Sequence, residues 1–214
     1  MGISAADVKT LRELSGAGMM DCKKALGECS GDMEKAKTWL REKGMASAEK
    51  RSGRVAAEGA VCSYIHMGGK IGVLAEINCE TDFVARGDKF LDLCKDICLQ
   101  ICSASPRWIR REEVPAEVIE AEKEIFIKQM EDSGKPENIL EKIAEGKLGK
   151  FFEENCLLEQ PFVKEPKTKV EDLIKELSGQ VGEKIDVRRF ERFQLGEGIE
   201  KKEVAQAVAD AGGN

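Results

Sequence analysis

Hydrophobic residues recur every three or four positions in the first 44 residues, which is the spacing of amphipathic helices. Ser4 and Asp7 have the spacing of a capping box, in which two side chains satisfy free backbone N–H groups at a helix start. Glycines and the sequence CSGD interrupt the periodic pattern. These features predict a module of three short helices over residues 1–44, with Gly44 as the C-terminal stop of the third helix.

Each of the three predicted helices has one apolar stripe. The stripes consist of Val8, Leu11 and Leu14, then Met19, Cys22, Ala25 and Leu26, then Met33, Ala36 and Leu40. A core of this size is marginal, so we expect the module to rest on a partner or to act as a mobile recognition module. Residues 45–58 have no strong apolar stripe and predict a connector, in part helical, that marks a domain boundary.

The hydrophobic period changes to two after the connector. Residues 61–66 and 71–77 alternate around a Gly-Gly turn, which predicts a β-hairpin. The second strand has one apolar face, formed by Ile71, Val73, Ala75 and Ile77. Residues 185–195 alternate again and predict a third strand that pairs with the hairpin. Its two expected faces are Val187, Arg189, Glu191 and Phe193, and then Arg188, Phe190, Arg192 and Gln194.

Helical periodicity returns between the hairpin and the third strand. A helix over residues 88–103 is expected to pack on the sheet through Phe90, Leu91, Cys94, Ile97, Cys98 and Ile101. Further helices are expected at about 116–131, 136–154 and 169–178, and in a C-terminal tail over 196–214. The first two of these have the pattern of an antiparallel helical hairpin. Because helices and strands are segregated, the sequence predicts an α+β core over residues 59–195, with a three-stranded antiparallel sheet packed on helices.

Charge narrows the range of partners. The formal net charge is -6, whereas a protein that binds nucleic acid directly needs a basic surface to neutralise phosphates. Residues 41–54 carry five Lys or Arg against two Glu, which leaves open a local nucleic-acid patch or an ordinary solvated linker.

No apolar run approaches the ~18 residues of a membrane span. The first residues lack the pattern of a signal peptide, so we expect a cytoplasmic protein without membrane contact.

The residues that usually carry enzyme chemistry do not converge on a catalytic arrangement. His66 is the only histidine, and it is interpreted as a surface residue or a ligand. Gly68, Gly69 and Lys70 lack the full phosphate-loop pattern. Cys94, Cys98 and Cys102 share one helix face, either as buried small hydrophobes or as a thiol or metal site without a convincing fourth ligand. We therefore predict no catalytic residues, no resident metal and no cofactor.

The segment INCETDFVAR, residues 77–86, is unusual because a strand ends in an acid and a phenylalanine. Turns favour Gly, Asn, Asp or Ser, so Phe83 needs something to bury against, either its own core or a partner. This segment and residues 11–26, LRELSGAGMMDCKKAL, resemble the two signature segments of bacterial elongation factor Ts, with Ser15 in place of the family's usual Thr. Residues 157–166 and 188–201 also resemble that family.

The resemblance implies a guanine-nucleotide exchange factor for the GTPase elongation factor Tu. It implies that residues 1–44 are similar to a ubiquitin-associated domain and contact the GTPase domain. The implied contact residues of this module are Lys9, Arg12, Met19 and Met20. The segment implied to intrude into the partner, so that the partner's Mg²⁺ loses its support, is Thr81, Asp82, Phe83 and Val84. Phe83 would enter an apolar gap between helices, whereas Val84 can simply anchor the loop.

Two further expectations concern assembly and the competing function. Longer family members have two copies of the α+β subdomain, whereas this chain has a single β-hairpin before its helical hairpin. It thus resembles the short form, and we expect a homodimer in which a second chain supplies the missing half, unless the helical hairpin covers the sheet itself. The competing class is a helical adaptor that binds another partner without exchanging nucleotide.

Overall fold

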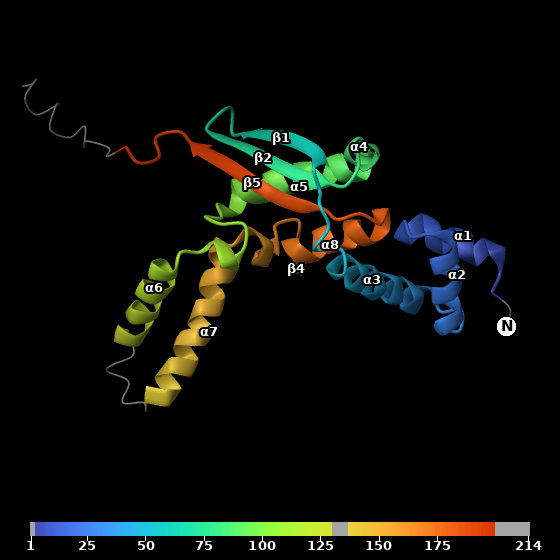
Figure 1. Ribbon diagram of the computed structural model, residues 1–214, viewed down its shortest axis with the longest axis horizontal. Helices are drawn as coiled ribbons and strands as arrows, with labels where there is room; N and C mark the ends of the chain where they lie inside the picture. Colours follow the sequence, from blue (N-terminus) through green and yellow to red (C-terminus); the bar gives the residue numbers. More distant parts are fainter. Residues whose placement is uncertain (1–2, 130–136, 200–214) are drawn as a thin grey trace, which may run out of the picture.

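The computed structural model describes residues 3–129 and 137–199, and the parts extend along one long axis (Figure 1). The N-terminal helices lie at one end, a three-stranded sheet lies in the middle, and a helical hairpin projects at the other end. Helices and strands form separate layers, which confirms the predicted α+β class. The tail predicted to be helical falls mainly on residues 200–214, outside the described residues.

The N-terminal module consists of α1 (Ala5–Ser15), α2 (Met19–Glu28) and the first part of α3 (Met33–Glu49). The predicted capping box is present, because the Asp7 backbone N–H donates to Ser4 Oγ at 3.0 Å and the Asp7 carboxylate accepts from Ser4 N. The buried residues of the module are Val8, Leu11, Cys22, Ala25, Leu26, Ala36 and Leu40. Leu14 and Met19 were expected in the apolar stripes but are exposed, so that part of the prediction is wrong.

The third helix does not stop at Gly44, which corrects the sequence prediction. Helix α3 continues to Glu49, so the predicted connector begins as helix. Gly44 lies instead where α3 crosses α8 (Val170–Val181), and a Cβ atom added to Gly179 would be 2.7 Å from Gly44 Cα. A glycine at this position permits a close helix crossing, and α3 continues through it.

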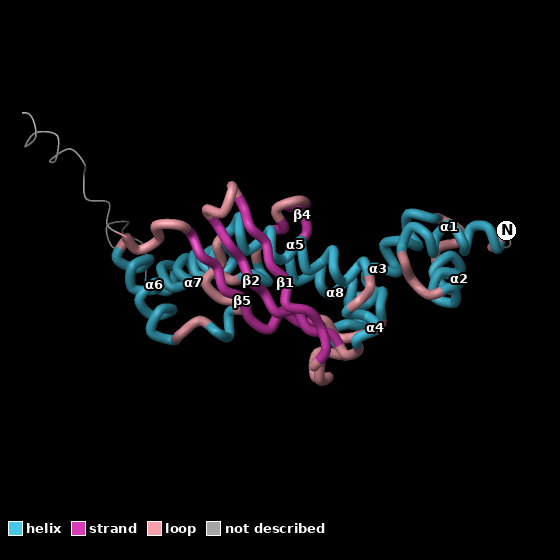
Figure 2. Tube along the Cα trace, turned by 90° about the horizontal axis from the view of Figure 1, so that it is seen from above, coloured by secondary structure: helices cyan, strands magenta, loops and turns pink. Residues whose placement is uncertain are grey.

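The central sheet has the strand order β1 (Glu58–His66), β2 (Ile71–Cys79) and β5 (Asp186–Gln194), with both pairs antiparallel. Helix α5 (Asp88–Ala104) packs on one face, where the predicted apolar side of β2 is buried. Figure 2 shows the three strands crossing over this helix, with the opposite face turned to the viewer. Leu91 was expected in the core but is exposed, and Leu93 is buried in its place.

A β-bulge changes the expected faces of β5. Ile77 pairs with Val187 while the preceding Glu76 pairs with Arg189, so Arg188 is an extra residue. Strict alternation is therefore broken, because one additional residue reverses which face the following side chains occupy. Val187 is buried in the core, whereas Arg189, which was expected on the same face of the strand, is exposed on the outer face.

The remaining elements form the helical hairpin and the short segments next to it. They are η1 (Arg111–Glu113), α6 (Ala116–Lys128), α7 (Glu137–Asn155), η3 (Leu157–Glu159), β3 (Pro161–Phe162) and β4 (Glu165–Lys169). Helices α6 and α7 form the predicted hairpin, whose base has its own cluster of Val114, Leu148, Phe151, Phe152 and Cys156. The hairpin projects away from the sheet and does not cover it (Figure 1). The two-stranded β3–β4 ribbon was not predicted.

Candidate partner-binding site

The segment that the sequence singled out forms a one-turn helix between β2 and α5. This helix, α4 (Asp82–Ala85), begins after Thr81, whose backbone is extended and whose Oγ1 accepts a hydrogen bond from Val84 N at 3.4 Å. A threonine at this position satisfies one of the N–H groups left free at a helix start. The strand thus turns through a capped helix into α5, and the helical turn displays Asp82 and Phe83 at the surface.

Phe83 and Val84, although adjacent in this helix, lie in different environments. The Phe83 residue is 85% exposed, whereas Val84 is 8% exposed and belongs to the main core with Ala85. Phe83 therefore does not pack on its own core. Because Val84 is buried, it anchors the helix and is not itself displayed to a partner.

Asp82 is also displayed. Its carboxylate lies 3.0 Å from Arg86 Nη2, and both side chains are largely exposed. An exposed pair of this kind contributes at most about 1 kcal/mol, so it does not restrain the carboxylate strongly. Asp82 and Phe83 are adjacent, which places an acidic group and an apolar ring together on one surface.

Glu183 holds the backbone just before α4. Its carboxylate accepts hydrogen bonds from Thr81 Oγ1 at 2.6 Å, Thr81 N at 3.0 Å and Glu80 N at 3.1 Å. No sequence pattern marks this residue, which lies 102 positions after Thr81. An acid that follows a helix-terminating glycine carries no distinctive sequence signal, so only the fold brings the two segments together.

Glu80 makes a matching contact in the opposite direction. Its carboxylate accepts from Lys184 N at 2.6 Å and from Arg54 Nη1 at 3.3 Å. The Lys184 N–H, with the Arg54 guanidinium, holds the pKa of Glu80 below its ordinary value. We call these four residues, Glu80, Thr81, Glu183 and Lys184, the crossed clamp, because each segment supplies both an acceptor and a backbone donor.

A buried thiol lies beneath the same turn. Cys79 Sγ donates to the Thr81 carbonyl at 3.1 Å. Burial raises the pKa of Cys79 to about 11, with a further contribution from the Glu183 charge. The thiol is therefore protonated at neutral pH and serves as a weak donor that supports the turn.

The second predicted surface lies on the N-terminal module. Lys9 and Arg12 are exposed on α1, three positions apart and therefore on one face. Met19 and Met20, at the start of α2, are 47% and 75% exposed. Flexible, polarisable methionine side chains at a surface suit an adaptable protein contact.

Helix α4 lies at the edge of the sheet that is nearer to the N-terminal module (Figure 1). Gly16, at the turn that ends α1, lies against Lys89 Nζ of α5 and Gln180 Oε1 of α8, and these two side-chain atoms are 2.9 Å apart. Lys89 lies in the first turn of α5, shortly after α4. The turn between α1 and α2 thus lies against the start of α5, the helix that follows α4 in the chain.

The cysteine stripe of α5 faces the protein core. Cys94, Cys98 and Cys102 are buried among apolar side chains of the main cluster. Burial raises the pKa of Cys98 to about 12 and raises that of Cys94 as well. Within residues 3–129 and 137–199, no group of three or more His, Cys, Asp or Glu side chains has an arrangement suited to a metal ion.

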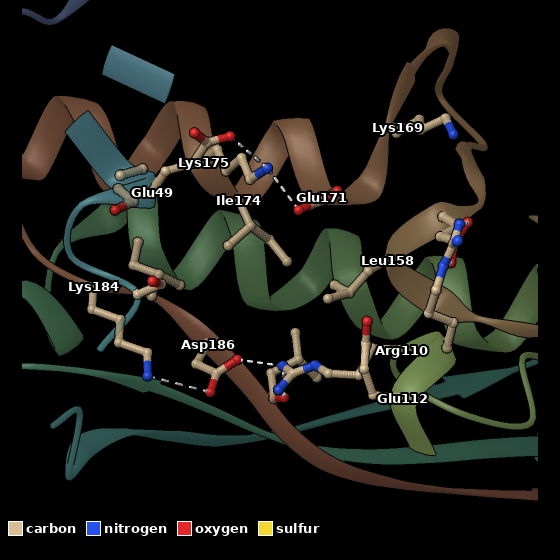
Figure 3. Close-up of a pocket in the computed structure, with 17 residues that line it drawn as sticks. Glu49, Arg110, Glu112, Leu158, Lys169, Glu171, Ile174, Lys175, Lys184 and Asp186 are labelled. Carbon is tan, nitrogen blue, oxygen red and sulfur yellow. Dashed lines mark hydrogen bonds and ion pairs between the residues drawn. The ribbon is translucent and has the colours of Figure 1, made fainter. Parts of the chain in front are cut away.

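A cavity of about 700 Å³ lies between α3, α8, β5 and the η1 segment. Figure 3 shows that charged side chains on its wall are paired with one another. Lys175 lies between Glu171 at 2.7 Å and Glu49 at 3.3 Å, and Arg110 Nη2 lies 2.6 Å from Asp186. None of the eight residues predicted for partner binding lines this cavity.

An exposed ring on a clamped helix, next to a second exposed surface on a separate module, is typical of a protein that acts by binding another protein. The family model described as Elongation factor TS matches residues 32–197. Elongation factor Ts from Anaeromyxobacter sp. (strain Fw109-5) is 60% identical over 99% of this chain and 97% of the relative. Elongation factor Ts from Geobacter sulfurreducens is 58% identical over 99% of this chain and 100% of the relative.

The chain therefore belongs to the elongation factor Ts family. The family that the signature segments predicted is confirmed, because these two relatives match over nearly the whole length of the chain. Membership of this family implies nucleotide exchange for elongation factor Tu in translation, with that GTPase as the partner. Within the described part of the chain, no helix is both long and apolar enough to cross a membrane.

Proposed function

We propose that this chain promotes GDP release from elongation factor Tu, without covalent chemistry, by inserting α4 into the GTPase domain. The observation that carries this proposal is the 85% exposure of Phe83 on a one-turn helix whose neighbour Val84 is buried. The ring enters an apolar gap in the partner, while Asp82 moves the groups that support the partner's Mg²⁺. Thr81 caps the inserted helix, and Val84 fixes it to the core.

Energies indicate that the whole interface must contribute. Burying a phenylalanine side chain yields roughly 1.5–3 kcal/mol. A nucleotide bound with nanomolar affinity is held by about 12 kcal/mol. The module must therefore supply further binding energy through Lys9, Arg12, Met19 and Met20, and loss of Mg²⁺ support must weaken the phosphate contacts.

Exchange follows from the reciprocity of binding. If the factor lowers the affinity of the GTPase for nucleotide, nucleotide lowers the affinity for the factor by the same ratio. GTP, followed by aminoacyl-tRNA, then releases the factor. The chain acts in the cytoplasm and touches neither nucleic acid nor membrane directly in this scheme.

We also propose that two chains pair through the outer face of the sheet. Val61, Ile65, Leu74 and Phe193 are exposed on this face, and none of the described helices or strands covers it (Figure 2). Ile65 and Phe193 are both opposite Gly72 in the register, so an apolar strip runs across all three strands. Several exposed apolar residues on one sheet face are typical of a protein interface.

Sedimentation experiments test this pairing. We expect the wild-type chain to sediment as a dimer and Phe193→Asp to sediment as a monomer at the same concentration. Ile125→Asp on α6 places the same charge at another exposed apolar residue, outside the strip, and serves as the control. A monomeric wild type would contradict the proposal.

Release of fluorescent GDP from elongation factor Tu tests the exchange activity itself. We expect the wild-type chain to accelerate release and to form a complex on gel filtration with the GDP form but not with the GTP form. A helical adaptor would bind without accelerating release. Absence of acceleration would therefore overturn the exchange proposal and favour the adaptor.

A further inference from the structure

Helix α4 is too short to hold itself in place. It contains four residues, Asp82–Ala85, and isolated helices of fewer than about 12 residues are marginal in water. Its orientation must therefore come from contacts with the rest of the chain. Burial of Val84 and Ala85 fixes one side, and the crossed clamp fixes the start of the helix.

The Glu183 carboxylate uses both of its oxygens in this clamp. Oε2 accepts from the backbone N–H groups of Glu80 and Thr81, while Oε1 accepts from Thr81 Oγ1. A hydroxyl has one proton to donate and retains lone pairs that accept. Once Thr81 donates to Glu183, its oxygen is oriented to accept from Val84 N, which is the capping bond of α4.

Glu183 directly follows α8, the helix on which α3 of the N-terminal module packs. Helix α8 ends at Gly182, whose left-handed backbone leads directly into Glu183. On α8, Gly179 contacts Gly44 of α3, and Arg51 Nη1 donates to the Ser178 carbonyl at 3.5 Å. One helix therefore positions the module and, within a few residues, the start of α4.

We infer that Glu183 is a positioning residue for exchange: it fixes α4, through Thr81, in the orientation that presents Phe83 while α8 holds the module beside it. This inference rests on the proposed function and deepens it. Glu183 acts through the backbone and hydroxyl that it binds, and it does not need to touch the partner. Its loss should therefore affect the rate of nucleotide release more than the affinity of the complex.

The test compares Glu183→Ala, Glu183→Gln and the control Glu112→Ala by stopped flow. Each variant is titrated against elongation factor Tu carrying fluorescent GDP, which gives a maximal release rate and a half-saturating concentration. We expect Glu183→Ala to lower the maximal rate by about tenfold, because three hydrogen bonds to a charged group are lost. The half-saturating concentration should change by less than about threefold, because the module surface is intact.

The conservative variant separates positioning from a general loss of structure. Glu183→Gln keeps one of the two acceptor oxygens, so it should recover most of the maximal rate. Glu112 is exposed on η1 and lies outside the clamp, so Glu112→Ala should match the wild type. Hydrogen exchange at the Thr81 amide should accelerate in Glu183→Ala while exchange in the core strand β2 is unchanged.

A double variant tests whether Glu183 acts through Thr81. If it does, the loss of maximal rate in Thr81→Val combined with Glu183→Ala should be smaller than the product of the two single losses, since both substitutions remove the hydrogen bond between Thr81 Oγ1 and Glu183. A wild-type maximal rate in Glu183→Ala would overturn the inference. The inference would also be overturned if Glu183→Ala lowered the maximal rate, the apparent affinity for the partner and the melting temperature together, because that pattern indicates a purely structural role. If the wild type itself does not accelerate release, the proposed function is wrong, and the inference that rests on it is wrong as well.

Discussion

Gly44 of α3 and Gly179 of α8 cross so closely that a Cβ atom on Gly179 would be 2.7 Å from Gly44 Cα. Both residues lie inside helices, where a glycine ordinarily lowers helix stability by about 1 kcal/mol relative to alanine. The crossing fixes the N-terminal module on the α+β core, so the two glycines serve packing at the expense of local helix propensity.

Gly179→Ala should therefore destabilise the protein. The added methyl group meets backbone atoms of Gly44, which cannot move without shifting α3, and overpacking of this kind costs about 1–3 kcal/mol. Urea unfolding measures the difference. Gly146→Ala is the matched control, because Gly146 lies in α7 with open space around it and should gain up to about 1 kcal/mol. Equal stabilisation by both substitutions would contradict the close crossing.

Phe83 and Val84 should respond oppositely in a stability measurement. Phe83→Ala removes an exposed ring and should leave the free energy of unfolding within about 0.5 kcal/mol of wild type. Val84→Ala removes buried methyl groups and should lower it by about 2 kcal/mol. Thermal unfolding of both variants decides this. A larger loss for Phe83→Ala than for Val84→Ala would show that the ring packs on the chain itself.

The Glu80 contact should make stability depend on pH. Because Lys184 N–H and Arg54 lower the pKa of Glu80 in the folded state, the charged carboxylate contributes stability above its ordinary pKa of 4.5. That contribution is lost as the pH falls through the lower, folded-state pKa. Glu80→Gln should thus be less stable than wild type at pH 7, and the difference should shrink below pH 4.5. A difference that is constant across this range would exclude a role for the charge.

The buried cysteines should resist thiol reagents. Burial raises the pKa of Cys98 to about 12, and the reactive form of a cysteine is the thiolate. In the folded protein at pH 8, we expect only the half-buried Cys29 and Cys62 to react rapidly with a disulfide reagent. Rapid reaction of Cys94, Cys98 or Cys102 would show that the α5 stripe is accessible, and metal analysis of the reduced protein would then be needed.

Periodicity in the sequence predicted the elements whose environment is simple. Helix α5 and the β1–β2 hairpin each have one face on a single core, so their apolar spacing alone determines how they lie. Gly44 was misjudged because the effect of a glycine depends on what lies opposite, and α8 is more than a hundred residues away. The β5 bulge was missed because alternation in the sequence does not reveal an unpaired residue such as Arg188.

The site was predictable only in part, for a related reason. The unusual aromatic at a strand end marked Phe83, and the family resemblance marked its neighbours. The sequence could not decide whether the ring faces the core or the solvent, because that depends on the burial of Val84 and on Glu183. Those contacts exist only after folding has brought β5 next to β2 and Glu183, just after α8, next to Thr81.

The central claim is that the displayed Phe83 ring drives nucleotide release. The most direct measurement is stopped-flow release of fluorescent GDP from elongation factor Tu at saturating concentrations of wild type, Phe83→Ala and Leu195→Ala. Leu195 is an exposed hydrophobic residue after β5 and serves as the matched control. We predict wild-type rates for Leu195→Ala and a loss of about tenfold or more for Phe83→Ala, which corresponds to the roughly 1.5–3 kcal/mol of a buried ring. A maximal rate for Phe83→Ala equal to that of wild type would contradict this claim.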